Sequence, residues 1–323
     1  MLIALTQLAA GFLILGLGGR YIVRGAVSVA LLARVSTAVV GLTVVAFGTS
    51  LPELAVSVKA AAGGSTDLAY ANVVGSSIVN IAVILSLTAL VRPVRILSQS
   101  REFEFPVMMV VLALCLFMAR DGLISQSEGA VLISGLVLFL MLTVRRTRRE
   151  GVQDHSHRGD EVKAIHPEGG SRTRAWSFGL GYVAIGIVGL WAGAEFMVAG
   201  AITIAESMGV SERIIGLTVV AMGTSLPELV TTLIAAKQGE DEIALSNLMG
   251  SNIFNILGVL GWTSLVVPVP IHPQAAGLDN WVMLGLGAAL LPIMWTSQKV
   301  TRWHATILLA AYTVYFLVLV KAA

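Results

Sequence analysis

The stretch GLTVVAFGTSLPEL at residues 41–54 recurs as GLTVVAMGTSLPEL at residues 216–229, and this duplication decides how the whole chain is organised. Thirteen of the fourteen positions are identical, at an offset of 175 residues. The same offset aligns NVVGSSIVNI at 72–81 with NLMGSNIFNI at 247–256 without a gap. Self-similarity at a fixed offset indicates two halves that are built from the same arrangement of elements.

The composition of the chain is that of a membrane protein. Hydrophobic residues make up 56% of the 323 residues and charged residues only 12%, with a mean hydropathy of +0.85, whereas a soluble domain carries about 25% charged residues. Apolar runs of about 20 residues can each cross a hydrocarbon layer about 30 Å thick. These runs are too long and too uniform for barrel strands, so the fold class is an all-α polytopic membrane protein.

Ten transmembrane helices are predicted, five in each half. Five is an odd number, so the second half enters the membrane from the opposite side and the two repeats are inverted. We expect the first repeat at 1–144, a polar linker at 145–175 and the second repeat at 176–323. The predicted spans lie near 2–22, 35–62, 68–91, 105–119, 128–144, 177–205, 213–236, 243–267, 278–296 and 304–320.

The basic residues predict the orientation in the membrane. If the N-terminus is outside, 17 of the 21 Lys and Arg residues face inside. Loops on the cytoplasmic side are enriched in these residues. We therefore expect both termini outside and the linker, with its His155, His157 and His166, in the cytoplasm. A prokaryotic cytoplasmic (inner) membrane is the expected location.

The GTSLPE motif predicts a broken helix with a cation site, in helices 2 and 7 of the ten. Thr49, Ser50 and Glu53 are three or four residues apart, so a helix places their oxygens on one face. Pro52 lacks an N–H and clashes with the carbonyl of Gly48, so the helix must break there. Broken helices at bilayer depth expose carbonyl groups that coordinate Na+ in transporters. The equivalent residues of the second half are Thr224, Ser225, Pro227 and Glu228.

The next helix of each half supplies further oxygens at i, i+4 spacing, from Ser76 and Asn80 and from Ser251 and Asn255. Ca2+ takes about six to eight hard oxygen ligands, and this set is entirely of that kind. Neither repeat motif contains Cys or His, the ligands of softer metals. Two carboxylates carry a charge that one Ca2+ neutralises, and Na+ ions competing for the same oxygens would give exchange.

Paired GTSLPE and GS-x-I-x-N-I motifs in inverted halves resemble the α-repeats of the cation/Ca2+ antiporter superfamily, in its prokaryotic Na+/Ca2+ exchanger branch. The resemblance covers both repeats. It implies that Glu53 and Glu228 bridge the Ca2+ and Na+ positions, with Asn80 and Asn255 at the central one. It further implies Na+ coordination by the hydroxyls of Thr49, Ser50, Ser76, Thr224, Ser225 and Ser251 and by the carbonyls of Ala46 and Ala221.

The chain differs at one site position from some members of the superfamily that it resembles. Some prokaryotic members of the superfamily carry Asp where this chain has Asn255, so the site here has less charge. Potassium-dependent members also place additional acids in the second repeat. The departure bears on potassium dependence and on the number of Na+ ions, and not on exchange itself.

Several alternatives stay open on the sequence alone. The asparagines could be hydrogen-bonding glue between helices, and the Ser and Thr hydroxyls could bond to their own helices. A Ca2+/H+ antiporter is the closest rival function, because a glutamate in the membrane can carry a proton. A passive cation channel fits an inverted repeat less well. A scaffold would be favoured only if mutating Glu53 and Glu228 left ion flux intact.

No enzyme motif such as G-x-S-x-G or H-E-x-x-H occurs in the spans, so we expect a transporter and not an enzyme. We expect no cofactor, with Ca2+ and Na+ as transported ions. The expected partners are these ions and the lipid bilayer, without nucleic acid, and the protein is expected to function as a monomer.

Overall fold

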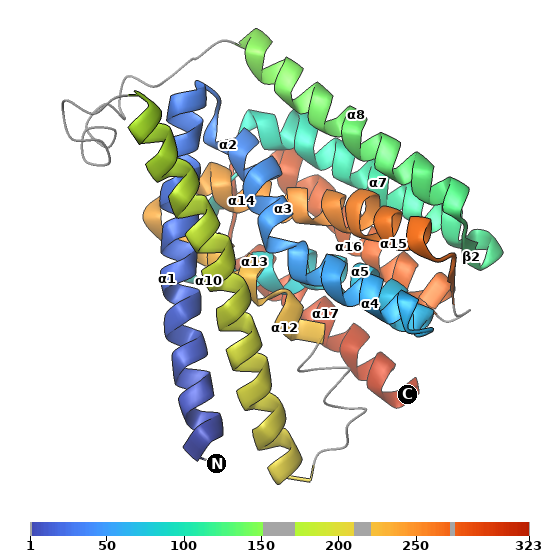
Figure 1. Ribbon diagram of the computed structural model, residues 1–323. Coiled ribbons are helices and arrows are strands. Elements are labelled where there is room, and N and C mark those ends of the chain that lie inside the picture. The colour runs from blue at the N-terminus through green and yellow to red at the C-terminus, as the bar shows by residue number, and fades with distance from the viewer. Residues whose placement is uncertain (1, 151–171, 210–220, 272–274, 323) are drawn as a thin grey trace.

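The computed structural model describes residues 2–150, 172–209, 221–271 and 275–322, which form a bundle of helices (Figure 1). The histidines of the linker lie outside these residues, as do positions 210–220. The first half contains α1 (Leu2–Ala33), α2 (Thr37–Val40), η1 (Gly41–Val45), α3 (Ala46–Thr49), α4 (Leu51–Ala62), α5 (Thr66–Val79), η2 (Asn80–Ile84), α6 (Leu85–Val91), η3 (Ser100–Glu104), α7 (Phe105–Met118), η4 (Ala119–Asp121) and α8 (Gln126–Glu150).

The second half repeats this order. It contains α10 (Arg172–Ser207), α12 (Ala221–Thr224), α13 (Leu226–Gln238), α14 (Asp241–Ile253), η6 (Phe254–Leu260), α15 (Gly261–Val266), η7 (Ala275–Asp279), α16 (Asn280–Thr296) and α17 (Arg302–Ala322). Several labels follow one another without a gap, because a π-helical turn interrupts one continuous helix. Within the described residues, the predicted spans correspond to one helix or to a run of these segments.

Among the described residues, eight helices are long and apolar enough to cross a membrane, and one bent pair, 37–49 with 51–62, is a ninth candidate. The equivalent pair of the second half, α12 and α13, is described only from residue 221 onward. The helical membrane fold is thus confirmed in this part of the chain. The count of ten and the inversion of the repeats stay predictions.

The first helix is longer than the sequence suggested, and this is a correction. It was expected to end near residue 22, but α1 continues to Ala33. At about 1.5 Å per residue, 32 residues span about 48 Å, well beyond a hydrocarbon layer of about 30 Å. Arg20 and Arg24 are exposed within the helix and do not follow it. Arginine is a good helix former, so charge alone does not end a helix.

The two longest helices, α1 and α10, lie side by side and antiparallel along one flank of the bundle (Figure 1). Glycines allow their backbones to touch. A Cβ atom built on Gly18 would lie 2.7 Å from the backbone nitrogen of Leu190, and one on Gly186 would lie 2.5 Å from that of Ile22. Small residues permit this close approach where hydrophobic driving force between membrane helices is weak.

Two short strand pairs join the halves. β1 (Val94–Arg95) pairs antiparallel with β4 (Lys299–Val300), and β2 (Leu123–Ile124) pairs antiparallel with β3 (Val269–Pro270). The 175-residue offset relates β1 to β3, and it relates β2 to β4 with a shift of one residue. Each pair therefore takes one strand from each half, which agrees with a two-fold relation between the repeats.

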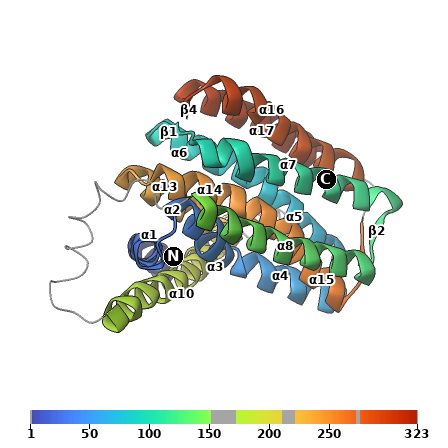
Figure 2. The same cartoon turned by 90° about the horizontal axis from the view of Figure 1, so that it is seen from above.

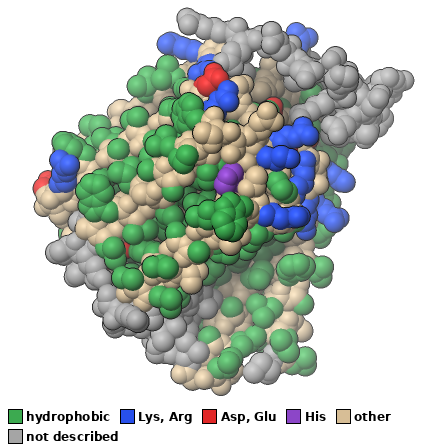
Figure 3. Space-filling view, turned by 180° about the vertical axis from the view of Figure 1, so that it is seen from behind, with side chains coloured by type: hydrophobic (Ala, Val, Ile, Leu, Met, Phe, Trp, Pro, Cys, Tyr) green, Lys and Arg blue, Asp and Glu red, His purple; other side chains and the backbone are tan. Residues whose placement is uncertain are grey.

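The segment α14–η6–α15 lies at the centre of the bundle, between α4, α5, α7 and α8 (Figure 2). Many large apolar side chains are exposed on the outer helices, including Phe12 at 71% and Val110 at 68%. Figure 3 shows hydrophobic side chains spread over one face, with the Lys and Arg side chains gathered mainly in its upper part. This surface suits contact with lipid and with a charged membrane boundary.

Candidate ion-binding site

Each GTSLPE motif breaks its helix, as predicted. The helix of the first half ends at Thr49, Ser50 leaves helical geometry (φ −85°, ψ 5°), and α4 starts with Pro52 in its first turn. The segments on either side are bent by 41°. Ser225 has almost the same dihedral angles (φ −88°, ψ 5°) ahead of Pro227. The break places the following carboxylate in the first turn of a new helix.

The two breaks contact each other through crossed hydrogen bonds. The Ser50 hydroxyl donates to Oε1 of Glu228 at 3.2 Å, and the Ser225 hydroxyl donates to Oε1 of Glu53 at 3.2 Å. The two glutamates are 1% and 2% exposed. Each carboxylate is thus held by the serine of the other half, and the site is formed by both repeats together.

Much of the predicted ligand set has oxygen atoms without any hydrogen-bond partner among the described residues. Buried polar atoms nearly always have a partner, and leaving one unpaired costs about 1–3 kcal/mol. A cluster of such atoms therefore indicates a site that a ligand completes. Within the predicted ligand set, the unpaired buried atoms are Oε2 of Glu53, Oε2 of Glu228, the hydroxyls of Ser76 and Ser251, Oδ1 of Asn80, and both amide atoms of Asn255.

This pattern bears on two alternatives left open by the sequence: hydrogen bonding of the asparagines between helices, and hydrogen bonding of the hydroxyls to their own helices. Ser76 and Ser251 do not bond to their own helices in the described structure. Asn255 likewise forms no bond to a neighbouring helix there. Both asparagines lie in π-helical turns, Asn80 at the start of η2 and Asn255 within η6. Such turns are frequent at functional sites.

The carbonyl of Ala46 differs from this pattern. It accepts hydrogen bonds from the backbone N–H of Ser50 at 3.0 Å and from the Thr49 hydroxyl at 3.2 Å. The carbonyl that Pro52 cannot engage is that of Gly48. A cation at Ala46 would therefore compete with the Thr49 hydroxyl. Ala221, the equivalent residue, is the first residue of α12.

Two asparagines brace the site through hydrogen bonds to its residues and their neighbours. Neither asparagine was predicted from the sequence. The amide of Asn72 donates to the Glu53 carbonyl at 3.2 Å and to the Ser57 hydroxyl at 2.9 Å, and its oxygen accepts from Thr224 at 3.5 Å. In the same way, Asn247 donates to Thr232 at 3.0 Å and accepts from Thr49 at 3.4 Å. Both asparagines begin the second repeated motif, and that position is the feature that could have identified them.

The charge of the site is not neutralised by basic side chains that the structure describes. Arg92 pairs with Asp241 and Arg101 pairs with Glu102, and neither of these ion pairs involves a site glutamate. The described chain also contains no group of three or more His, Cys, Asp or Glu residues that could hold a metal. The site instead combines two carboxylates with hydroxyl and amide oxygens, which are ligands for hard cations.

A third buried glutamate, for which the sequence offered no role, lies outside this site. Glu104 is fully buried and accepts bonds from Ser100 at 2.8 Å, from Ser246 at 2.8 Å and from Gln99 at 3.2 Å. Ser246 precedes Asn247, so Glu104 fixes η3 against the helix that carries one of the bracing asparagines. These bonds hold Glu104 within the packing of η3 against α14.

The fold and the site together define an integral membrane transporter with buried oxygen ligands between two repeated halves. A family model described as the sodium/calcium exchanger protein matches residues 3–145 and 178–321, and the chain belongs to this family. Its members are exchangers and not enzymes.

The chain is similar to two relatives and one solved structure over 80% to 98% of its length. The sodium/calcium exchanger MaX1 of Methanosarcina acetivorans is 31% identical, with 96% of each chain covered. The inner membrane protein YrbG of Escherichia coli is 36% identical over 257 residues, which cover 80% of this chain and 78% of that one. A solved structure of the sodium-calcium exchanger NCX_Mj, soaked with zero Na+ and Ca2+, superposes with a TM-score of 0.84 at 29% identity, covering 98% of this chain and 99% of that one.

Proposed function

We propose that the protein exchanges Ca2+ for Na+ by alternating access at the site between the two repeats. The observation that carries the proposal is the set of buried, unpaired oxygens on Glu53, Ser76, Glu228 and Ser251. Two carboxylates without a basic partner match the charge of one Ca2+. Membership of the sodium/calcium exchanger family and similarity to MaX1 support the choice of ions.

The proposed ligands are the twelve residues expected from the sequence. Competition explains the coupling: Ca2+ and Na+ share the carboxylates, so the site holds one kind of ion at a time. An empty site would leave two carboxylates in the membrane, which is costly. The empty protein therefore either protonates a glutamate or does not change sides, and this makes movement of one ion depend on the other.

The proposed topology has ten helices in two inverted repeats, with both termini outside and the 145–175 linker in the cytoplasm. The excess of basic residues on one side supports this orientation. The inner-membrane name of the relative YrbG supports a prokaryotic cytoplasmic membrane. A monomer is proposed as the functional unit, because the crossed bonds complete the site within one chain.

The test is uptake of radioactive Ca2+ into proteoliposomes under an outward Na+ gradient. A matched experiment replaces the Na+ gradient with a pH gradient. The site variant is Glu53→Gln, and the control is Glu102→Gln, the same change on a carboxylate that is 55% exposed. Uptake that depends on Na+ and is lost only in Glu53→Gln supports the proposal. Uptake driven only by the pH gradient would replace it with Ca2+/H+ exchange.

A further inference from the structure

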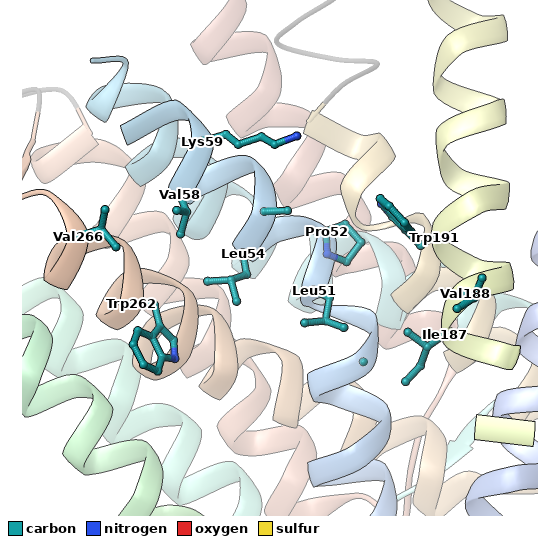
Figure 4. Close-up of a pocket in the computed structure, with 12 residues that line it drawn as sticks. Leu51, Pro52, Leu54, Val58, Lys59, Ile187, Val188, Trp191, Trp262 and Val266 are labelled. Carbon is teal, nitrogen blue, oxygen red and sulfur yellow. The ribbon is translucent and has the colours of Figure 1, made fainter. Parts of the chain in front are cut away.

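A groove on the outer surface of the bundle lies directly behind the helix break of the first half (Figure 4). We call it the α4 groove; it is formed by α4 together with α10 and α15 and has a volume of about 730 Å3. Leu51 and Pro52 form its floor, Trp191 and Trp262 flank it on opposite sides, and Lys59 lies at one end. Cavities of this size hold small ligands in other proteins.

The α4 groove faces lipid and not an aqueous path. Trp191 and Trp262 are 53% and 50% exposed, and both belong to helices apolar enough to cross the membrane. Every lining residue except Lys59 is apolar. A cation path needs oxygen ligands and would avoid an ammonium group, so this lining does not suit ions. An apolar cavity that opens to lipid is filled by hydrocarbon, because water finds no polar partners there.

Lys59 gives the groove a charged end. It is exposed, three residues before the end of α4 at Ala62, and its ammonium group forms no ion pair with any residue that the structure describes. Lysine side chains near helix ends extend along apolar surface and place the charge at the level of the lipid headgroups. The equivalent residue of the second half is Ile234. The charge is therefore not part of the duplicated ion chemistry.

We propose that the α4 groove binds one anionic phospholipid. An acyl chain lies against Leu51, Pro52 and Ile187, and the headgroup phosphate pairs with the ammonium of Lys59. Hydrocarbon fills the apolar length of the groove, and the single positive charge selects a headgroup with a net negative charge. The bound chain would support the α4 side of the break, opposite to the ion site.

The tryptophans provide a direct test in proteoliposomes that contain phospholipids with brominated acyl chains, which quench tryptophan fluorescence on contact. Two single-tryptophan proteins are compared, one retaining Trp191 and one retaining Trp295. Trp295 is also 53% exposed but lies on α16, away from the groove. We expect brominated phosphatidylglycerol to half-quench Trp191 at less than half the mole fraction needed for brominated phosphatidylcholine. At Trp295 the two lipids should quench equally.

Two variants in the Trp191 protein separate the parts of the site. Lys59→Gln should abolish the headgroup preference while leaving quenching by both lipids. Ala55→Leu should fill the groove and remove the high-affinity quenching. The same two substitutions are made in the Trp295 protein, where unchanged quenching of Trp295 shows that the protein is folded. Equal quenching of Trp191 by both lipids, or stronger quenching by aqueous iodide than by either lipid, would overturn the proposal.

Discussion

The two helix breaks are alike where they meet and different at their backs. At the meeting point, Ser50 binds Glu228 and Ser225 binds Glu53 at the same distance of 3.2 Å. Behind the first break, α10 leaves the α4 groove open. Behind the second break, α1 packs closely against α13: a Cβ atom built on Gly19 would lie only 2.6 Å from the side chain of Ile234. The two copies of the motif thus form equivalent hydrogen bonds where they meet, but they are packed differently on their other side.

The far ends of the same helices differ in charge as well. Arg92 at the end of α6 donates a hydrogen bond to the carbonyl of Ala236 and lies 3.4 Å from Asp241. The equivalent positions of the other half hold Val267, Ala61 and Thr66, which cannot form an ion pair. The comparison shows that the hydrogen bonds between the breaks are duplicated, whereas the packing and the ion pair around them are not. The proposed alternating-access mechanism requires such an asymmetry in any one conformation.

The largest effect is expected at the glutamates, where the two halves are equivalent. Glu53→Gln and Glu228→Gln should each lower exchange by about 30- to 5,000-fold, because removing one buried charge of a matched set costs about 2–5 kcal/mol. Initial rates of Na+-driven Ca2+ uptake measure both. A variant that keeps more than half of its activity would show that the two carboxylates are not equivalent ligands.

The bracing asparagines should give a smaller and again symmetric effect. Asn72→Ala and Asn247→Ala remove the acceptors of Thr224 and Thr49, and an unpaired buried group costs about 1–3 kcal/mol. We expect the Na+ concentration for half-maximal exchange to rise about tenfold in each. Ser77→Ala is the control, because its hydroxyl bonds only to the Val73 carbonyl of its own helix.

A double-mutant cycle sharpens this prediction. Thr224→Val combined with Asn72→Ala should cost less than the sum of the two single changes, since the contact between these side chains is lost in each of them. Fully additive effects would show that the 3.5 Å contact between the two side chains carries no coupling.

Loss of the Arg92 ion pair should increase the accessibility of the helix after the second break, whereas the equivalent change in the other half should not affect the helix after the first break. Arg92→Gln removes an ion pair whose arginine is 37% exposed, a pair worth at most about 1 kcal/mol. A cysteine introduced at Thr231, one turn beyond Glu228, should then react about two- to fivefold faster with a charged thiol reagent. The measurement uses a Cys115→Ala background. Val267→Ala, tested with a cysteine at Val56, should leave the labelling rate unchanged.

The smallest effect is expected on stability, at a pair of acids related by the repeat. Glu104 accepts from three side chains, whereas Asp279 accepts from the Tyr315 hydroxyl at 3.0 Å. Glu104→Gln should lower the melting temperature in detergent by a few degrees, which corresponds to about 1 kcal/mol. Asp279→Asn should lower it less. The opposite order would show that bond number does not decide the contribution of these acids.

Local features of the site were predictable because they depend on neighbours along the chain. Pro52 and Pro227 predicted both breaks, since a missing N–H and a ring clash act within one helical turn. Apolar runs located the spans, but their ends were wrong where charged residues continue a helix, as Arg20 and Arg24 do in α1. The ligand roles of the twelve proposed residues stay a prediction.

The amino-acid sequence alone specifies a helical membrane protein with duplicated, broken helices, because hydropathy and proline act locally. The contacts across the halves follow from the three-dimensional packing. It pairs Ser50 with Glu228, at a separation of 178 residues, and it brings Asn72 behind Glu53. It also leaves the α4 groove between α4, α10 and α15, and it packs α1 against α13. Such contacts depend on how helices pack in three dimensions, and no spacing along the chain encodes them.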